Sequence, residues 1–285
     1  YSIAKTMADR NSDNIRAFLK WALPHLGMRW QGFRKVYGQV EKRIRQRLVE
    51  LDLRSLSEYR QYLRRHPDEW DRLDAMCIIT ISRFYRDAEV YDALRSDVLP
   101  TLARRAANEN RDFIDAWSAG SASGEEPYSV RLCWDLDVAE QFPSLTLRIT
   151  ATESTPHMID RAHRACYPDG CLKELPDEWY DRAFEPDEGS DELCLRDEFH
   201  HDIEFLHQDI RNEQPGGPFD LVLCRNLAFT YFDESTQRDT LDALRAHMRP
   251  DAALVIGRTE SLPSGDTHFK DWDTTDCLFV LASSG

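Results

Sequence analysis

The chain of 285 residues contains no long apolar run and no segment of strongly biased composition. Its longest apolar runs, such as residues 221–224 and 252–257, are far shorter than the roughly 18 residues that span a bilayer. The mean hydropathy is −0.59, and the first residues lack the charged-then-apolar pattern of a signal segment. We therefore expect a cytoplasmic protein that is not inserted in a membrane. We also expect a monomer.

The sequence also lacks the residue patterns of a disulfide framework or a metal site. Its seven cysteines are odd in number, scattered and without a CxxC pair. Such cysteines are typical of reduced, mostly buried thiols in a reducing compartment. The histidines, among them His200, His201 and His207, have no cysteines or carboxylates at metal-ligand spacing. The sequence therefore predicts reduced thiols and no metal.

The formal net charge of −15 is unevenly distributed along the chain. Residues 1–75 hold 16 basic and 10 acidic residues, a net of +6, whereas the remainder holds 20 basic and 41 acidic residues, a net of −21. This shift indicates a domain boundary near residues 75–90. The basic excess is concentrated between Arg29 and Arg47, where Glu41 is the single acid.

The hydrophobic pattern predicts a helical first part and an α/β second part. Val36, Val40, Ile44 and Leu48 recur at helical spacing, and further helices are predicted at residues 57–64 and 68–76. From about residue 111, strand-like runs alternate with helical segments, which is typical of a parallel α/β sheet. The predicted strands are residues 113–117, 145–152, 203–206, 219–224, 253–257 and 277–282. Residues 170–200 interrupt this alternation and are predicted to form a small inserted unit.

The most informative stretch is residues 117–129, Trp-Ser-Ala-Gly-Ser-Ala-Ser-Gly-Glu-Glu-Pro-Tyr-Ser, between a predicted strand and a predicted helix. Gly120 and Gly124 allow a tight turn close to a ligand, and ligands of open α/β sheets bind beyond the carboxyl ends of the strands. Glu153 ends the next strand, where its carboxylate can accept hydrogen bonds from two ribose hydroxyls. The turn is not a GxGxxG motif and has no phosphate-binding lysine. A nucleoside without phosphates is therefore favoured, with a purely structural turn as the alternative.

Two further polar segments follow predicted strands. Asp209 could accept a hydrogen bond from an adenine amino group, and Arg225 and Asn226 follow the buried strand at residues 219–224. A nucleoside with a cationic sulfur and an amino-acid tail would use all of these positions. S-adenosyl-L-methionine, with S-adenosyl-L-homocysteine as its demethylated product, is such a molecule and is the expected cofactor.

These segments resemble the CheR-type methyltransferases, which methylate glutamate side chains of chemotaxis receptors. The resemblance covers residues 36–282. It is carried by residues 80–86 (Thr-Ile-Ser-Arg-Phe-Tyr-Arg), 117–129, 151–153 (Ala-Thr-Glu), 224–232 (Cys-Arg-Asn-Leu-Ala-Phe-Thr-Tyr-Phe) and 257–260 (Gly-Arg-Thr-Glu). It implies an α/β fold with a Rossmann-like class I methyltransferase sheet. The implied domains are an all-helical domain at residues 1–85, a methyltransferase domain at 86–285 and a β subdomain inserted at about 170–205.

The resemblance assigns the family's functional residues to positions of this chain. The acidic residue of its Gly-Glu-Glu-Pro-Tyr motif falls on Glu125 or Glu126, of which Glu126 is favoured as the partner of the methionine ammonium. With Gly120 of the turn, the implied cofactor-binding residues are Thr80, Ser82, Arg86, Gly120, Glu126, Glu153, Asp209, Ile210, Arg225 and Asn226. The implied catalytic residues are Arg86, which would hold an acceptor carboxylate, and Tyr231, near the transferred methyl group.

The chain departs from the family at several of these positions. Thr80 stands where the family has asparagine, Ser82 where it has threonine and Glu153 where it has aspartate; Thr230, Arg258 and Thr259 also differ from the family's residues. Each change keeps a polar or acidic function, so cofactor binding is better supported than the identity of the acceptor.

The expected reaction is O-methylation of a carboxylate, such as a glutamate side chain of an acidic, receptor-like protein. The alternatives are methylation of a small-molecule carboxylate or thiol, or a non-catalytic module that senses the cofactor. Arg86 could instead form a structural ion pair with Asp87 or a neighbouring acid, and Tyr231 could simply be a packed tyrosine.

The basic stripe from Arg34 to Arg47 is expected to face the mouth of the active site and recruit the acidic acceptor. A solvated helix face is the alternative. Nucleic acid is disfavoured because the chain is acidic and the stripe lacks interleaved aromatics.

Overall fold

The computed structural model describes residues 15–272 and 275–282, which form two compact units. The helical unit comprises the described residues up to Ile79 together with Thr230–Gln237, and the α/β unit comprises the rest. This division falls within the region of the charge shift, six residues before the end of the expected helical domain. The expectation about a signal segment concerns residues 1–14, which lie outside the described residues. No described helix is both long and apolar enough to cross a membrane.

The helical unit is built from amphipathic helices around an apolar core. Residues 15–22 are helical, and the further elements are the 3-10 helix η1 (Leu23–Leu26), α2 (Trp30–Phe33), α3 (Tyr37–Glu50), α4 (Leu56–Arg65) and α5 (Glu69–Cys77). The predicted apolar stripe of α3 is confirmed for Val40, Ile44 and Leu48, which are buried, whereas Val36 is the half-buried residue that precedes the helix. Ser55 caps α4 by accepting a hydrogen bond from the Glu58 N–H at 3.2 Å.

A buried carboxylate joins the helices α3, α4 and α5. Arg47 donates to both oxygens of Glu69 at 3.0 and 2.8 Å, and the Tyr59 hydroxyl donates to the same carboxylate at 2.8 Å. Burial would raise the pKa of Glu69, but the bonds from Arg47 and Tyr59 hold it below its usual value. Arg47 therefore stabilises the helical unit itself.

The basic stripe on and before α3 contains both paired and exposed cations. Arg43 donates to the carbonyls of Met76 and Ile78 at 3.0 and 2.6 Å, and Arg45 donates to Glu41 at 2.9 Å. The stripe's cations that are exposed and make no hydrogen bond or ion pair with another described residue are Arg34, Lys35 and Lys42. The free positive surface is therefore smaller than the sequence suggests.

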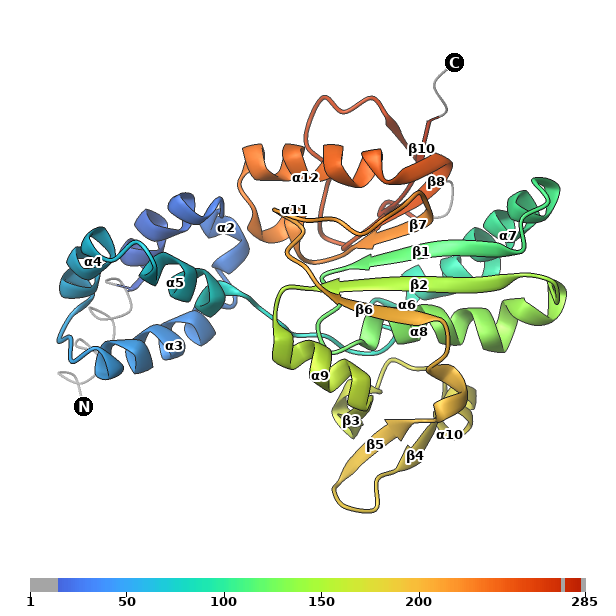
Figure 1. Cartoon of the computed structure of the whole chain (residues 1–285), viewed down its shortest axis with the longest axis horizontal. Helices are drawn as coiled ribbons and strands as arrows, with labels where there is room; N and C mark the ends of the chain where they lie inside the picture. The colour runs from blue at the N-terminus through green and yellow to red at the C-terminus, as the bar shows by residue number, and fades with distance from the viewer. Residues whose placement is uncertain (1–14, 273–274, 283–285) are drawn as a thin grey trace. The chain divides into compact units, whose positions relative to one another are not determined.

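The α/β unit contains a seven-stranded sheet in the order β6-β2-β1-β7-β8-β10-β9 (Figure 1). Its strands are β1 (Phe113–Ala119), β2 (Thr146–Glu153), β6 (Ile203–His207), β7 (Phe219–Cys224), β8 (Met248–Ile256), β9 (Phe269–Asp271) and β10 (Leu278–Leu281). The first five strands in this order are parallel, as predicted. The last two are antiparallel, because the described residues between β8 and β10 form no crossover helix.

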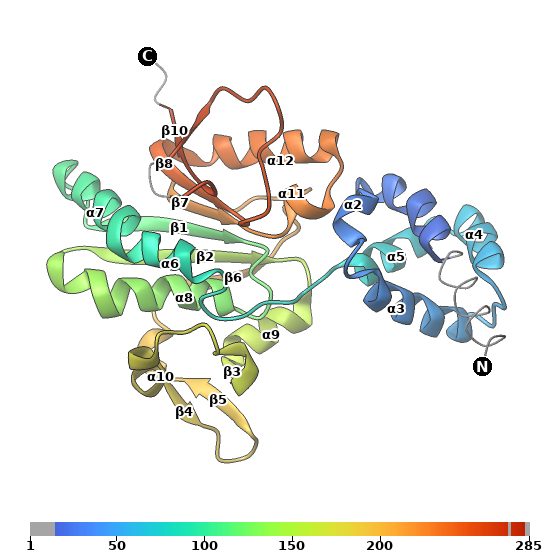
Figure 2. The ribbon, with the colours of Figure 1, turned by 180° about the vertical axis from the view of Figure 1, so that it is seen from behind.

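Helices surround this sheet. They are α6 (Ala88–Ala93), α7 (Leu99–Asn108), α8 (Glu125–Cys133), α9 (Pro156–Arg164), α11 (Ala228–Tyr231) and α12 (Glu234–Ala246), with the π-helical turns η2 (Leu94–Val98) and η3 (Trp134–Val138) and the 3-10 turn η4 (Ala139–Gln141). Figure 2 shows α6, α7 and α8 together on one face of the sheet. The boundary between the two units falls inside α11 and α12.

Between α9 and β6 lies a small antiparallel sheet in the order β3-β5-β4. Its elements are β3 (Cys166–Pro168), η5 (Asp169–Cys171), α10 (Asp177–Ala183), β4 (Phe184–Pro186), β5 (Glu192–Leu195) and the following η6 (Asp197–Phe199). We call residues 166–196 the inserted unit. It starts slightly earlier than the predicted residue 170, because β3 was too short to be recognised in the sequence.

One pair of cysteines in the inserted unit is oxidised. Cys166 on β3 is directly opposite Cys194 on β5, and the two form a disulfide bond across the sheet. The prediction of reduced thiols is wrong for this pair, since the strand register that brings the two together is not visible in their sequence spacing. The other five cysteines are thiols, most of them buried.

Candidate functional site

The predicted cofactor residues follow the carboxyl ends of neighbouring strands in the α/β unit. Gly120 follows β1, Glu153 ends β2, Asp209 follows β6 and Arg225 follows β7. Because these strands are parallel and adjacent, the four positions lie at one edge of the sheet. The ten predicted cofactor residues all belong to this unit, whereas Tyr231 belongs to the helical unit.

The turn after β1 needs glycine at two positions. Gly120 and Gly124 have φ angles of +79° and +93°, which residues with a Cβ rarely adopt. A Cβ on Gly120 would lie 2.5 Å from a side-chain carbon of Leu227, and one on Gly124 would lie 3.0 Å from the Cβ of Ala162. The predicted tight turn between strand and helix is therefore confirmed.

Glu153 joins this turn to the end of β2. Its carboxylate, 5% exposed, accepts hydrogen bonds from the N–H groups of Ala122 and Thr155, both at 2.9 Å. The Ser154 hydroxyl also donates to Oε1, at 3.3 Å, whereas Oε2 accepts only the Ala122 N–H among the described residues and can accept a second bond. Glu153 thus holds the glycine turn and keeps acceptor capacity at Oε2 for a predicted ribose hydroxyl.

Glu126 lies between β1 and Arg225. Its carboxylate accepts the Ser118 hydroxyl at 2.8 Å and lies 3.5 Å from the Arg225 guanidinium. Burial raises the pKa of Glu126, and the charge of Arg225 opposes that rise. Glu125, the alternative that the motif left open, instead accepts the Ser123 hydroxyl at 2.8 Å.

Arg225 connects three segments through one buried guanidinium. It donates to the Tyr91 hydroxyl at 3.0 Å, to the Arg86 carbonyl at 2.7 Å and to the Asp87 carboxylate at 2.9 Å. Asp87 is therefore paired with Arg225. The Arg86 guanidinium donates to the Ile81 carbonyl at 3.0 Å.

Asp209, the expected acceptor for an adenine amino group, forms an ion pair within the chain. Arg211 donates to both of its carboxylate oxygens, at 3.0 and 2.6 Å. Burial would raise the pKa of Asp209, but these bonds hold it below its usual value. The Asp209 carboxylate thus forms an ion pair with Arg211, two residues further along the chain, which the sequence analysis did not predict. Ile210 beside it is buried.

Glu260 is a site residue to which the sequence analysis gave no role. Its carboxylate accepts the N–H groups of Asn226 at 2.9 Å and Gly257 at 2.6 Å, at the ends of β7 and β8. Asn226 lies beyond the end of β7 and has a left-handed backbone, φ +54°, and the Glu260 carboxylate supplies the acceptor for its N–H. The sequence signal for this role is Glu260 itself, the last residue of the 257–260 segment that carries the family resemblance.

Five buried polar atoms at or beside the predicted site have no hydrogen-bond partner among the described residues. They are the Ser121 hydroxyl oxygen, the Gln208 amide oxygen, Oε2 of Glu125, Oγ1 of Thr155 and Nε of Arg225. Buried polar atoms are normally paired, so these fit a site that a polar ligand completes. No group of described histidine, cysteine, aspartate or glutamate side chains is arranged to hold a metal ion.

Tyr231 packs within the helical unit. Its ring lies 5.1 Å from that of Phe33, and its carbonyl accepts the Arg29 N–H at 2.8 Å. The packing agrees with the alternative given for this tyrosine, and its role near the methyl group stays a prediction.

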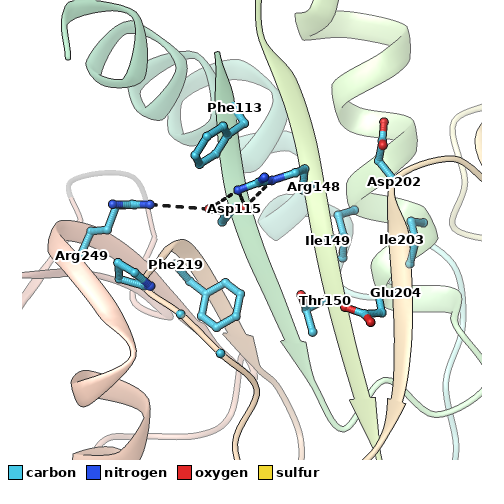
Figure 3. Close-up of a pocket in the computed structure, with 13 residues that line it drawn as sticks. Phe113, Asp115, Arg148, Ile149, Thr150, Asp202, Ile203, Glu204, Phe219 and Arg249 are labelled. Atoms are coloured by element: carbon cyan, nitrogen blue, oxygen red, sulfur yellow. Dashed lines mark hydrogen bonds and ion pairs between the residues drawn. The ribbon is translucent and has the colours of Figure 1, made fainter. Parts of the chain in front are cut away.

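A pocket of about 590 Å³ lies at the opposite edge of the sheet, where β1 and β2 begin (Figure 3). Its charged groups mostly neutralise one another: Arg148 donates to both oxygens of Asp115 at 2.7 and 2.9 Å, and Arg249 lies 3.6 Å from the same carboxylate. The Arg148 guanidinium also stacks on the Phe113 ring at 3.6 Å. None of the predicted cofactor residues lines this pocket, and we assign it no part in the reaction.

Comparison with known proteins gives a family match over most of the chain. Residues 80–278 match the family described as CheR methyltransferase, SAM binding domain, and residues 37–74 match CheR methyltransferase, all-alpha domain. The chemotaxis protein methyltransferase of Borreliella burgdorferi is 23% identical over 254 residues, which cover 88% of each chain. That of Escherichia coli is 27% identical over 236 residues, covering 81% of this chain and 78% of the other.

Fold, site and comparison together define an S-adenosylmethionine-dependent methyltransferase with a Rossmann-like class I sheet. The chain belongs to the CheR methyltransferase family. The predicted fold, cofactor and enzyme class are thereby confirmed, while the roles of individual residues stay predictions.

We expect Glu153→Ala to weaken the binding of S-adenosylhomocysteine at least about tenfold, because charge-assisted hydrogen bonds to the ribose are lost. The measurement is a calorimetric titration, with the melting temperature of the variant as the control for folding. Glu153→Gln keeps an acceptor oxygen and should lie between the alanine variant and the wild type. A folded alanine variant with unchanged affinity would refute the ribose assignment.

Proposed function

We propose that the chain transfers a methyl group to a carboxylate, and first of all to a glutamate side chain in an acidic protein segment. The observation that carries the proposal is the state of Arg86. The Arg86 guanidinium donates a hydrogen bond to the backbone carbonyl of Ile81. Asp87, the acid next to it in the chain, is bound by Arg225 instead. Arg86 can therefore offer its planar fork to an acceptor carboxylate.

The reaction makes modest chemical demands on the protein. S-adenosylmethionine, when bound, supplies an electrophilic methyl group on a sulfonium. A carboxylate acceptor is already ionised at neutral pH, so the site needs no strong general base. The residues mainly have to align acceptor and donor, and alignment of this kind is worth roughly 7–11 kcal/mol.

Three of the proposed cofactor contacts pair a residue of this chain with a particular part of S-adenosylmethionine. The Glu126 carboxylate would hold the methionine ammonium, the Glu153 carboxylate would accept from the ribose, and the buried Ile210 would contact the adenine. The names of the relatives, chemotaxis protein methyltransferases, support a protein acceptor over a small molecule. We keep a cytoplasmic location as part of the same proposal.

We expect Arg86→Lys to lower turnover at least about tenfold while cofactor affinity changes less, since lysine keeps the charge but loses the bidentate fork. The assay follows tritiated methyl groups from S-adenosylmethionine into an acidic acceptor protein. A methyl ester on a carboxylate releases its label as volatile methanol in base. Label that resists base would contradict the carboxylate proposal, and an equal loss of turnover and cofactor binding would contradict the role of Arg86.

The exposed cations before and on α3 are the proposed recruiting surface for that acceptor. Arg34, Lys35 and Lys42 are exposed, and they lie in the part of the sequence with a net charge of +6. Electrostatic attraction between these cations and an acidic acceptor acts mainly on the encounter rate. At ordinary salt it is screened within about 8–10 Å.

We expect the double variant Lys35→Glu/Lys42→Glu to raise the Michaelis constant for the acceptor at low salt and to weaken its salt dependence. Cofactor affinity should stay the same. The matched control is Arg64→Glu/Arg65→Glu, an equal charge change at the end of α4. If the two double variants behave alike, the cations before and on α3 are only a solvated surface, and a neutral or small acceptor becomes the better proposal.

A further inference from the structure

The segment that carries Arg86, residues 83–87, is bound to the inserted unit. Arg83 pairs with Glu174 at 3.0 Å, and the Phe84 N–H donates to the Cys171 carbonyl at 2.9 Å. We call residues 83–87 the arginine segment. Arg86 can hold an acceptor carboxylate only if the backbone of this segment directs its side chain correctly. The contacts that fix the backbone of the segment therefore matter for the reaction.

Aromatic rings extend this contact. The Phe84 ring lies 4.8 Å from Tyr167 and 5.0 Å from Phe184, both edge-on. The buried Tyr85 ring lies 5.3 Å from Trp179 of α10. These partners all belong to the inserted unit, which therefore forms one wall around the arginine segment.

The backbone of the arginine segment is unusual at the two residues that flank Arg86. Tyr85 has φ +55° and Asp87 has φ +62°. The left-handed region is unfavourable for a residue with a Cβ, and most of all for a bulky one. Such conformations persist where the surroundings fix them, and they cluster at functional sites. The direction of Arg86 therefore depends on what holds its two neighbours.

The two neighbours are held from different parts of the α/β unit. The Tyr85 N–H donates to the Ser129 hydroxyl of α8 at 2.9 Å. The Asp87 N–H donates to Glu174 at 3.0 Å, and its carboxylate pairs with Arg225 at 2.9 Å. Glu174 uses one oxygen for this backbone bond and the other for Arg83.

We propose that Glu174 is a positioning residue of the cofactor site, acting through the N–H of Asp87 on the left-handed backbone that places Arg86. The same bond acts on Arg225, because Arg225 donates to the Arg86 carbonyl and to Asp87. Arg225 in turn lies against Glu126. The proposal rests on the proposed role of Glu126 in binding the cofactor. It gives the inserted unit a part in cofactor binding.

The structure offers variants that separate the two bonds of Glu174. Glu174→Ala removes both, Glu174→Gln keeps an oxygen for the Asp87 N–H, and Arg83→Met removes the ion pair alone. Glu174→Asp keeps the charge on a side chain one methylene shorter, which should no longer reach the Asp87 N–H. It replaces the alanine variant if that variant does not fold. The matched control is Glu185→Ala, which removes an ion pair with Arg196 elsewhere in the inserted unit.

The experiment measures S-adenosylhomocysteine affinity by calorimetry and the hydrogen-exchange rate of the Asp87 amide for each variant. We expect Glu174→Ala and Glu174→Asp to weaken binding at least about tenfold and to speed exchange at Asp87. Glu174→Gln, Arg83→Met and Glu185→Ala should remain within about threefold of the wild type.

Three results would overturn the proposal. Unchanged affinity in Glu174→Ala with faster exchange at Asp87 would make the bond structural only. Equal losses in Arg83→Met and Glu174→Ala would assign the effect to the ion pair. Absence of heat when the wild-type protein is titrated with S-adenosylhomocysteine would refute the cofactor assignment itself. If the wild type binds and the Glu174 variants bind equally well, only the role of Glu174 is refuted.

Discussion

The buried guanidinium of Arg225 is the interaction on which the proposed site depends. A buried charge is stable only when it is paired and hydrogen-bonded, and Arg225 meets this need with groups from three segments: Glu126 at the start of α8, Tyr91 on α6, and Asp87 with the Arg86 carbonyl before it. One charge at the end of β7 thus fixes the position of the helix start after β1 and of the arginine segment. Loss of one of these partners would leave the buried guanidinium with fewer hydrogen bonds and ion pairs.

The two glutamates at the start of α8 have different surroundings because successive helical residues point about 100° apart. Glu126 lies toward β1 and Arg225, through Ser118 and the guanidinium. Glu125 accepts the Ser123 hydroxyl and lies within reach of Ser82. Burial raises the pKa of both carboxyls. The motif thus supplies one carboxylate suited to an ammonium and another that supports the loop around it.

Much of the α/β fold could be predicted because its parallel strands are continuous apolar runs, as β7 is, and because glycines mark the turn after β1. The antiparallel strand β9 was missed because it is three residues long, and exposed at two of them. The Cys166–Cys194 disulfide and the Asp87–Arg225 pair join residues that are close only after folding. The Asp209–Arg211 pair joins residues that are two apart in the sequence, but a carboxylate that follows a strand is equally compatible with a ligand contact. Residues Thr230–Gln237 belong to the helical unit, which no local pattern at that point of the sequence indicates.

A calorimetric titration of the wild-type chain and of Glu126→Gln with S-adenosylhomocysteine tests the central claim most directly. Glu126 is 9% exposed and accepts the Ser118 hydroxyl, so glutamine can keep that hydrogen bond while the negative charge is lost. The account predicts micromolar or tighter binding by the wild type and at least about tenfold weaker binding by the variant. Equal affinities would show that the carboxylate does not hold the methionine ammonium, and absence of heat with the wild type would contradict the account as a whole.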